Sequence, residues 1–409
     1  MLPDGASEEV DLIPDTRDTP ESDGVPEQEV SDATTSDATY AEASETDALP
    51  AALDLALKWE GEAEGGGLDV FVSWGADGRV ALFSDGRPLA EGWVQFALFD
   101  PAGGPEAVAR RPLREQPSDI EPYADGCGLA GGGYVSVWNA AKFKDPRAFT
   151  YERINAELIL LDSDGATTRD VWLHPGSEEE SFISPQVECT PDGGFVVASV
   201  RWLPEPPVRY IIRRFDADGE PAGPEIVIDP PAPDRNSIGP VELFAAEDGT
   251  LTIGWETTVA PEFRRQFDWR QVLPGGVLGP SSKSPGFPYH PRIAASGPAG
   301  HVATVDFQDD RLTYERRGPT MSWYTFKQVA AKGPQTFQSP GIVGLGLPGV
   351  YALAYGVDEP EGRAVEIRVI DGTTDLVLSL PRHRGIGTIP RGARRGNHVA
   401  FAWRESGVV

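Results

Sequence analysis

The sequence predicts an all-β fold, a seven-bladed β-propeller of four-stranded antiparallel blades, and three observations support this prediction. Glycine (46 residues) and proline (38 residues) make up about a fifth of the 409 residues, which is typical of short strands joined by many turns. A pattern of four short alternating segments recurs at intervals of about 50 residues, the spacing of propeller repeats. Long patterns of helical period are absent.

The clearest repeat unit runs from Ser184 to Asp229. Its first half, "SPQVECTPDGGFVVASVRW", predicts a strand that ends at Asp-Gly-Gly and a second strand, "FVVASV". Its second half, "RYIIRRFDADGEPAGPEIVID", predicts a third strand, a turn and a fourth strand. The order recurs along the chain and predicts blades at about 68–111, 118–174, 181–229, 236–279, 287–331, 337–380 and 384–409.

The last unit is incomplete. Its sequence, "IPRGARRGNHVAFAWRESGVV", supplies only a first and a second strand, which leaves a sheet edge in need of a partner. In "LDLALKW" (Leu53–Trp59), leucine and tryptophan alternate with Asp54, Ala56 and Lys58, as in a two-faced strand. We expect this strand, at about 53–59, to close the ring within a propeller domain at 51–409. The alternative is a segment that packs elsewhere or frays.

Residues 1–50 differ from the rest in composition. They hold fifteen acidic residues, one base (Arg17) and almost no large apolar residues, which predicts a disordered acidic tail. The tail resembles the flexible tether that follows the lipidated cysteine of many bacterial lipoproteins, and a plain solubilising extension is the alternative. The start, "MLPDGASEEV", has no signal-peptide pattern, so the chain is either cytoplasmic or an exported protein whose signal has been removed. No apolar run predicts a transmembrane segment.

The units resemble a bacterial propeller repeat of the form "P-x-V-A-x-L-x-D-G-G-F-V-V-A-W … R-F-D-A-D-G-x-P-x-G-x-E-F-x-V", found in exported and surface-attached proteins. The likeness is strongest for residues 184–229, fair for residues 68–174 and weak after about residue 280. This resemblance implies a β-propeller, export and a binding role. Together with the tether-like tail, it leads us to expect a lipoprotein of the cell envelope or the extracellular space. No catalytic residue comes with it.

The stretch "FDADGEPAGPEIVI" (Phe215–Ile228) starts like a calcium loop. An EF-hand loop requires ligands at its first, third and fifth positions, glycine at the sixth and glutamate at the twelfth. Here Gly219 stands fourth and apolar residues close the stretch, so Asp216 and Asp218 predict a tight turn between two strands. The same applies to "DSDG" at residues 162–165. We expect no metal site and no cofactor.

The two cysteines, Cys127 and Cys189, fall at nearly the same repeat position in neighbouring units, one residue out of register. Inner strands of adjacent blades lie side by side, so a disulfide between them is geometrically possible and would require an oxidising compartment. The alternative is two unpaired buried thiols.

One segment is basic, although the chain as a whole is acidic. "PRHRGIGTIPRGARRGNH" (Pro381–His398) holds five arginines, two histidines and no acid in a protein of net charge −29. Part of it is predicted to line the channel or one of its mouths, as an anion site for a carboxylated glycan, a phosphate or the acidic tail. The candidate ligand-binding residues are Arg382, Arg384, Arg391, Arg394 and Arg395. A solvated loop is the alternative.

The tryptophans Trp138, Trp202, Trp255 and Trp403 recur at a fixed repeat position, which indicates blade packing. The net charge argues against nucleic acid as a partner, and no catalytic motif such as GxSxG or HExxH is present. The sequence therefore favours an exported, envelope-associated, non-enzymatic binding or scaffold propeller that recognises a protein or polysaccharide. A glycan-active hydrolase or lyase and a structural subunit of a surface assembly are the alternatives.

Overall fold

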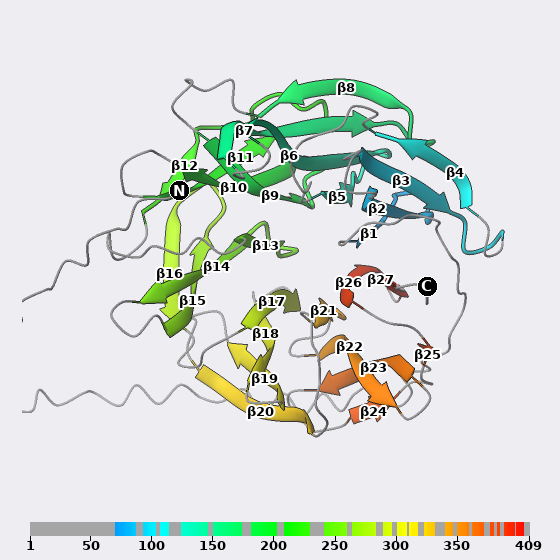
Figure 1. The fold of residues 1–409 in the computed structure, drawn as a ribbon, viewed down its shortest axis with the longest axis vertical. Helices are drawn as coiled ribbons and strands as arrows, with labels where there is room; N and C mark the ends of the chain where they lie inside the picture. The colour runs from blue at the N-terminus through cyan, green and yellow to red at the C-terminus, as the bar shows by residue number, and fades with distance from the viewer. Residues whose placement is uncertain are drawn as a thin grey trace, which may run out of the picture. The chain divides into compact units, whose positions relative to one another are not determined.

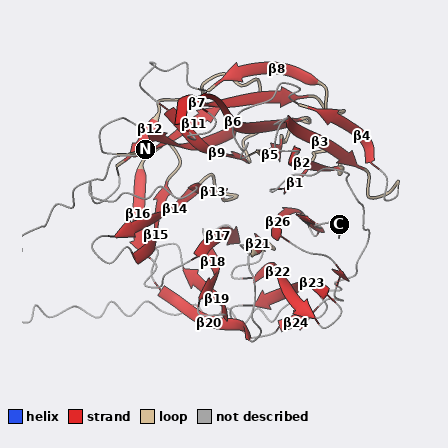
Figure 2. Ribbon diagram, viewed as in Figure 1, coloured by secondary structure: helices blue, strands red, loops and turns tan. Residues whose placement is uncertain are grey.

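The strands group into small antiparallel sheets that follow the order of the chain. The computed structural model describes residues 70–86, 93–103, 107–113, 124–145, 150–173, 181–202, 208–229, 241–259, 264–283, 289–296, 301–308, 311–317, 323–331, 340–346, 350–359, 362–371, 377–379, 383–384, 388–396 and 398–404. Within these residues every regular element is a strand (Figure 2).

The first four sheets each contain four strands, joined in chain order. Sheet 1 consists of β1 (Val70–Trp74), β2 (Val80–Gly86), β3 (Trp93–Phe99) and β4 (Ala107–Pro112). Sheet 2 consists of β5 (Asp125–Gly128), β6 (Tyr134–Asp145), β7 (Thr150–Leu161) and β8 (Thr167–Trp172). Sheet 3 consists of β9 (Ser181–Cys189), β10 (Phe195–Trp202), β11 (Arg209–Phe215) and β12 (Ile226–Ile228). Sheet 4 consists of β13 (Val241–Ala245), β14 (Leu251–Val259), β15 (Arg264–Val272) and β16 (Leu278–Lys283).

Three further sheets complete the described part of the chain. Sheet 5 is again four-stranded, with β17 (Tyr289–Ser296), β18 (His301–Gln308), β19 (Arg311–Arg317) and β20 (Trp323–Ala331). Sheet 6 has β21 (Gly341–Gly344), β22 (Val350–Glu359), β23 (Gly362–Asp371), β24 (Val377–Ser379) and β25 (His383–Arg384). Sheet 7 has only β26 (Thr388–Arg395) and β27 (His398–Arg404), the two strands predicted for the last unit.

The first strands of the sheets form a closed ring. β1 contacts β5, β5 contacts β9, and the series continues through β13, β17 and β21 to β26, which returns to β1. Figure 1 shows the sheets following one another in chain order, from blue to red. Four-stranded meanders with their first strands around a common axis are the blades of a β-propeller, so the predicted all-β propeller is confirmed.

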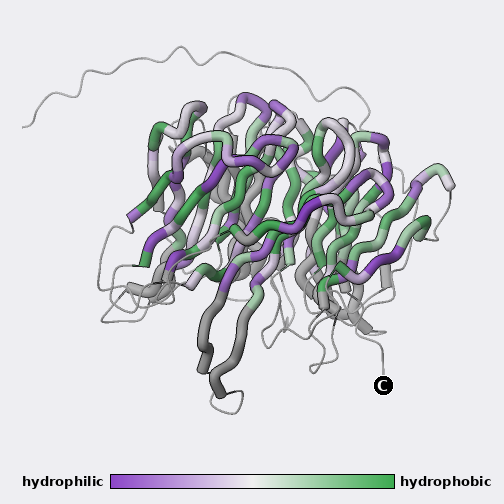
Figure 3. The backbone as a smooth tube through the Cα atoms, turned by 90° about the horizontal axis from the view of Figure 1, so that it is seen from above, coloured by the Kyte–Doolittle hydropathy of each residue, from purple (hydrophilic) through white to green (hydrophobic). Residues whose placement is uncertain are grey.

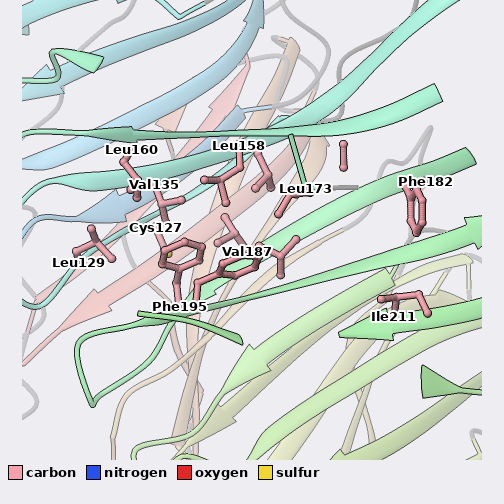
Figure 4. Packing of buried hydrophobic residues seen from close by; sticks show 14 residues of the cluster. Cys127, Leu129, Val135, Leu158, Leu160, Leu173, Phe182, Val187, Phe195 and Ile211 are labelled. Atoms are coloured by element: carbon pink, nitrogen blue, oxygen red, sulfur yellow. The ribbon is translucent and has the colours of Figure 1, made fainter. Parts of the chain in front are cut away.

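The hydrophobic core lies between neighbouring sheets. Between sheets 2 and 3, Val135 and Leu158 pack with Val187 and Phe195 in one buried cluster (Figure 4). Between sheets 7 and 1, Ala402 of β27 packs with the buried residues of β1, β2 and β3. The ring is therefore held by apolar burial at its first and last sheets as well as within it.

The second strand β10 is largely apolar because both of its faces are covered. In β10, Phe195 and Val197 pack toward sheet 2. The alternate residues Val196, Ala198 and Val200 pack toward sheet 4. A strand buried on both faces has a continuous apolar sequence instead of an alternating one. In Figure 3 hydrophobic and hydrophilic segments alternate along the chain.

The Asp-Gly turns join strands within the blades. In the turn after β11, the N–H of Asp216 donates to the carbonyl of Glu220 (2.9 Å), and Gly219 adopts a φ of 78°. Asp216 Oδ1 accepts the backbone N–H groups of Asp218 (3.0 Å) and Glu220 (2.8 Å). The carboxylate is thus occupied by backbone donors, and glycine supplies the positive φ of a hairpin turn.

Prolines interrupt the first strands at repeated positions. The ladder between first and second strands shifts register at Ser184–Pro185 in β9, at Pro291 in β17 and at Pro390 in β26. Proline has no N–H to donate to a ladder, so it occupies bulges and edges. Ser184 has a φ of 50° at the first of these bulges. The proline of the repeat motif therefore marks where each of these first strands bends.

Two sequence predictions lie outside the described residues, namely the closure strand Leu53–Trp59 and the acidic tail at 1–50. The side chains of Trp202 and Trp403 also lie outside the described set. Trp138 and Trp255 are buried, with exposed fractions of 1% and 3%, as blade-packing residues should be.

A disulfide joins Cys127 at the end of β5 to Cys189 at the end of β9. The Cα atoms are 5.6 Å apart and the residues are 62 positions apart in sequence. Cys127 pairs with the second residue of β6 and Cys189 with the first residue of β10, so the two strands are offset by one residue. The bond therefore ties two adjacent blades together beside the axis of the ring.

We expect the double substitution Cys127→Ala and Cys189→Ala to lower the free energy of unfolding by about 4 kcal/mol, because the bond closes a loop of this length in the unfolded chain. Urea unfolding of the wild-type and variant proteins measures the difference. Mass spectrometry without reductant, on protein recovered from its native compartment, should show a peptide pair linked through these cysteines. Free thiols there would contradict the linkage.

Candidate functional site

The first strands enclose a cavity of about 400 Å³ along the axis of the ring. Among the residues whose side chains the structure describes, those of β1, β5, β9, β13, β21 and β26 contribute to its wall. We call this cavity the channel. Because most of the wall residues sit on hydrogen-bonded strands, with Ala246, Glu247 and Gly396 in turns, the channel is built mainly from rigid elements.

The channel wall is predominantly acidic. Its charged residues, among those the structure describes, are Asp125, Glu188, Glu242, Glu247 and Arg394. The sequence predicted a basic anion site at the channel or one of its mouths, and four of these five described side chains are carboxylic. The electrostatic character of the wall therefore favours a cationic group over an anionic one.

Asp125 is fixed by the backbone of two strands. Its Oδ1 accepts the N–H of Gly126 (2.8 Å), and its Oδ2 accepts the N–H of Val187 (2.9 Å) in the neighbouring blade. Gln186 repeats the arrangement one blade further, because its Oε1 accepts the N–H of Leu243 (3.0 Å). Side chains of the first strands thus hold the next first strand in register, and Asp125 is oriented by this contact.

Glu188 is half-buried in β9, directly before the disulfide cysteine Cys189. Burial of the carboxyl group, together with the nearby carboxylate of Asp125, raises the pKa of Glu188 well above its ordinary value of 4.5. Desolvation is the larger cause, since it removes the water that would stabilise the charged form. The wall therefore contains a carboxyl group that holds its proton more strongly than an exposed glutamate.

Arg394 extends from β26 to the far side of the ring. Its Nη1 lies 3.5 Å from Glu247 Oε1, in the turn after β13, and its Nε donates to the carbonyl of Gly396 (2.7 Å). The guanidinium lies so close to Gly346 that a Cβ there would overlap it. Turns of sheets 4, 6 and 7 thus meet at this one side chain, at the end of the channel where first strands turn into second strands.

Of the five predicted arginines, Arg394 and Arg395 have side chains that the structure describes, and these two contact different parts of the ring. Arg395 lies beside Arg394 in sequence but donates to the carbonyl of Ala76 in sheet 1. Arg391 is paired with Ala402 in the backbone ladder, and its side chain is outside the described set.

The backbone of Arg384 pairs with Ala364, near the start of β23 in sheet 6. Arg394 and Arg395 lie in sheet 7, next to the turn between β26 and β27, which is at the opposite end of a blade. Arg382 lies outside the described residues. Among the arginines whose side chains are described, Arg394 lines the channel.

The acidic wall residues were missed because sequence analysis weighed clusters and motifs, not single positions on the first strands. Each one stands in or next to a short strand that precedes a turn: Asp125 in "ADGCGL", Glu188 in "QVECTP" and Glu242 in "VELF". Once the repeat register is known, an acidic residue within a first strand can be recognised as a candidate residue of the channel wall.

Neither a metal site nor a membrane helix is found in the part of the chain that the structure describes. No three His, Cys, Asp or Glu side chains there are grouped to hold an ion. The same residues include no helix of the length and apolarity that crossing a bilayer requires.

The substitution Glu188→Gln tests the environment of this carboxyl group. A raised pKa in the folded state means that ionisation opposes folding, so stability is lost as the pH rises through that pKa. We expect the variant to be more stable than the wild type at pH 8, by on the order of 1 kcal/mol, and equally stable below the ordinary pKa of 4.5, where both states bind the proton.

Thermal or urea unfolding at several pH values measures this gain. Glu220→Gln is the matched control, because its side chain is 60% exposed on the turn after β11. A gain in Glu188→Gln that does not depend on pH would contradict the assignment.

Comparisons with known proteins reveal the fold. No family model matches the chain, and no curated protein matches it in sequence. A protein of unknown function from Dyadobacter fermentans is similar in structure, with a TM-score of 0.52 and 9% identity over 76% of this chain and 96% of that one. The WD40 domain of Toxoplasma gondii coronin has a TM-score of 0.50 and 9% identity, over 86% of this chain and 81% of that one.

The polysaccharide lyase Uly1 has a TM-score of 0.48 and 12% identity, over 74% of this chain and 77% of that one. At these identities structural likeness speaks to fold and not to activity. Together with the ring of first strands, the first two likenesses show that this chain is an all-β propeller.

Proposed function

We propose that this chain is an exported, envelope-associated binding protein, without enzymatic activity, that receives a polar group of a protein or polysaccharide in its channel. The observation that carries this proposal is the cavity of about 400 Å³ between the first strands, with charged side chains on its wall. Concave sites with a few oriented polar groups are the usual form of ligand-binding sites in proteins.

The rigidity of the wall supports binding. Asp125 is held by two backbone N–H groups, and Glu188 adjoins the disulfide between β5 and β9. A binding group that is already oriented loses little conformational freedom when a ligand arrives. The channel therefore has the preorganisation that a recognition site needs.

The disulfide supports export. Disulfides form and persist in oxidising compartments and are rare in the cytosol. The link between Cys127 and Cys189 fits a protein of the envelope or the extracellular space. In this proposal the acidic residues 1–50 serve as the tether between the propeller and a lipid-anchored end.

We further propose a ring of seven blades, in which Leu53–Trp59 completes the last one. Sheet 7 has two strands where five other sheets have four, and β26 contacts both β21 and β1. A strand added to β27 would cover its free edge. Seven blades closed by the two ends of the chain would make the ring continuous.

Two deletions test the closure. Removing residues 1–49 should leave the melting temperature nearly unchanged, whereas removing residues 1–59 should lower it by several degrees, because the free edge of β27 would lose its partner. Differential scanning calorimetry provides both values. Equal melting temperatures for the two truncated proteins would exclude closure by this strand.

A cysteine footprint tests binding in the channel. Phe244 lines the channel, and Val108 on the outer strand β4 is 56% exposed. In Phe244→Cys, we expect an envelope polysaccharide or envelope protein fraction to slow alkylation of the new thiol severalfold, because the bound group would occupy the channel.

Val108→Cys is the control and should be alkylated at the same rate with and without each fraction. The polysaccharide and protein fractions are tested separately, so the protecting one identifies the class of partner. Unchanged alkylation of the cysteine at position 244 in both fractions would count against a channel site.

A further inference from the structure

The hairpin of β6 and β7 in sheet 2 extends beyond its blade. Both strands have 12 residues and are the longest in the described part of the chain. β5 pairs with β6 only at residues 134–137, and β8 pairs with β7 only at residues 157–161. Further out, within the described residues, the ladder joins β6 and β7 to each other alone. The hairpin therefore continues as a two-stranded extension.

We call residues 141–145 and 150–154 the ribbon. Directly before it the hairpin is packed in its blade, because Asn139, Ala140 and Ala156 are buried and β9 contacts both strands. Each strand contributes five residues to the ribbon, which is about 16 Å of extended chain. The ribbon is thus long enough to act as a separate contact element.

Basic and aromatic residues pair across the ribbon. Lys142 is directly opposite Arg153, and Phe143 is directly opposite Tyr151. Successive residues of a strand belong to opposite faces, so one face has a basic pair and the other an aromatic pair. Like charges directly opposite each other destabilise a ladder. An anionic partner on the basic face would remove this cost.

The charge of this hairpin differs from that of the other hairpins. Between the second and third strands, the sequence holds acidic residues and no base in sheets 3 to 6, but an arginine and no acid in sheet 2. The acids of the ribbon are not opposite its bases, since Asp145 is opposite Thr150 and Glu152 falls at a register shift. An extension of one repeat unit is often the binding part of a repeat protein.

The two faces together narrow the kind of anionic partner. An acidic chain in solution that engaged the basic pair would leave the aromatic pair on the other face in water. A membrane surface is entered end-on, so aromatic residues reach the acyl boundary while lysine and arginine stay at the phosphates. That boundary lies about 5–10 Å deep, which is less than the length of the ribbon.

We propose that the ribbon inserts into an anionic lipid surface and holds the propeller against a membrane of the envelope. Lys142 and Arg153 bind lipid phosphates, and Phe143 and Tyr151 enter the boundary between headgroups and acyl chains. This contact goes beyond the proposed binding in the channel, because it uses none of the residues of the channel wall.

Vesicle sedimentation with the full chain tests the proposal. Vesicles that contain phosphatidylglycerol should bind the protein at least about tenfold more tightly than vesicles of phosphatidylcholine alone, and added salt should weaken this binding. The soluble acidic polysaccharide polygalacturonate is tested in parallel. Binding to polygalacturonate without binding to the anionic vesicles would overturn the proposal and indicate an acidic glycan as the partner.

The double substitution Lys142→Glu and Arg153→Glu should weaken binding to anionic vesicles at least about thirtyfold, because each basic residue contributes about a factor of five at such a surface. The matched control is Arg110→Glu with Arg111→Glu, on the exposed part of β4, which changes the net charge equally and should bind like the wild type. Near-ultraviolet circular dichroism shows whether both variants are folded. Equal losses in the two variants, or no loss in the first, would contradict a role of the ribbon.

Insertion is tested separately from electrostatic attraction. Both natural cysteines are in the disulfide, so a fluorophore can be attached to Thr150→Cys alone. On anionic vesicles, spin labels on the acyl chains should quench this fluorophore, whereas the same fluorophore on Val108→Cys should stay unquenched. Equal quenching at the two positions would exclude insertion of the ribbon.

The channel and ribbon proposals can fail independently. The alkylation footprint of Phe244→Cys is measured without vesicles. Protection by an envelope fraction without vesicle binding would keep the channel proposal and remove the ribbon proposal. Vesicle binding that requires Lys142 and Arg153, without protection at position 244, would have the opposite meaning.

Discussion

The structure depends on one constraint, that the second strand of each blade must be covered on both faces. In β10 the side chains alternate between the cluster shared with sheet 2 and the cluster shared with sheet 4. In an open row of such sheets, the outer face of the first sheet and the outer face of the last sheet would be apolar and uncovered. They are covered only if these two sheets pack against each other. The packing of Ala402 against sheet 1 covers them, so apolar burial itself requires a closed ring.

A closed ring places the first strands around a common axis, where they cannot be covered by another sheet. Their side chains therefore have two roles. Some hold the neighbouring strand, as Gln186 does for Leu243, and the disulfide from Cys127 does this covalently. Others, such as Glu188, face a cavity that packing does not fill. The cavity is thus a consequence of ring closure and needs no separate domain.

The repeat pattern predicted the blades because local signals and global packing agree in this fold. Continuous apolar second strands such as "FVVASV" and Asp-Gly turns such as Asp216–Gly219 have the same physical cause in every unit. The site was less predictable, since its carboxylic residues are single positions on different first strands. The arginine-rich segment drew attention by composition, yet only contacts in space show that Arg394 is engaged by Glu247 while Arg395 reaches sheet 1.

Strand β26 links the stability of the ring to the charge of the channel. The Trp74 indole Nε1 donates to the carbonyl of Ala393 (3.2 Å), and this contact joins the last sheet to the first. The next residue, Arg394, carries the guanidinium that partly offsets the acids of the wall. If β26 moved away from β1, the ring closure would be weakened and the positive charge of Arg394 would leave the channel wall. Both effects would occur at once because Ala393 and Arg394 lie on the same short strand.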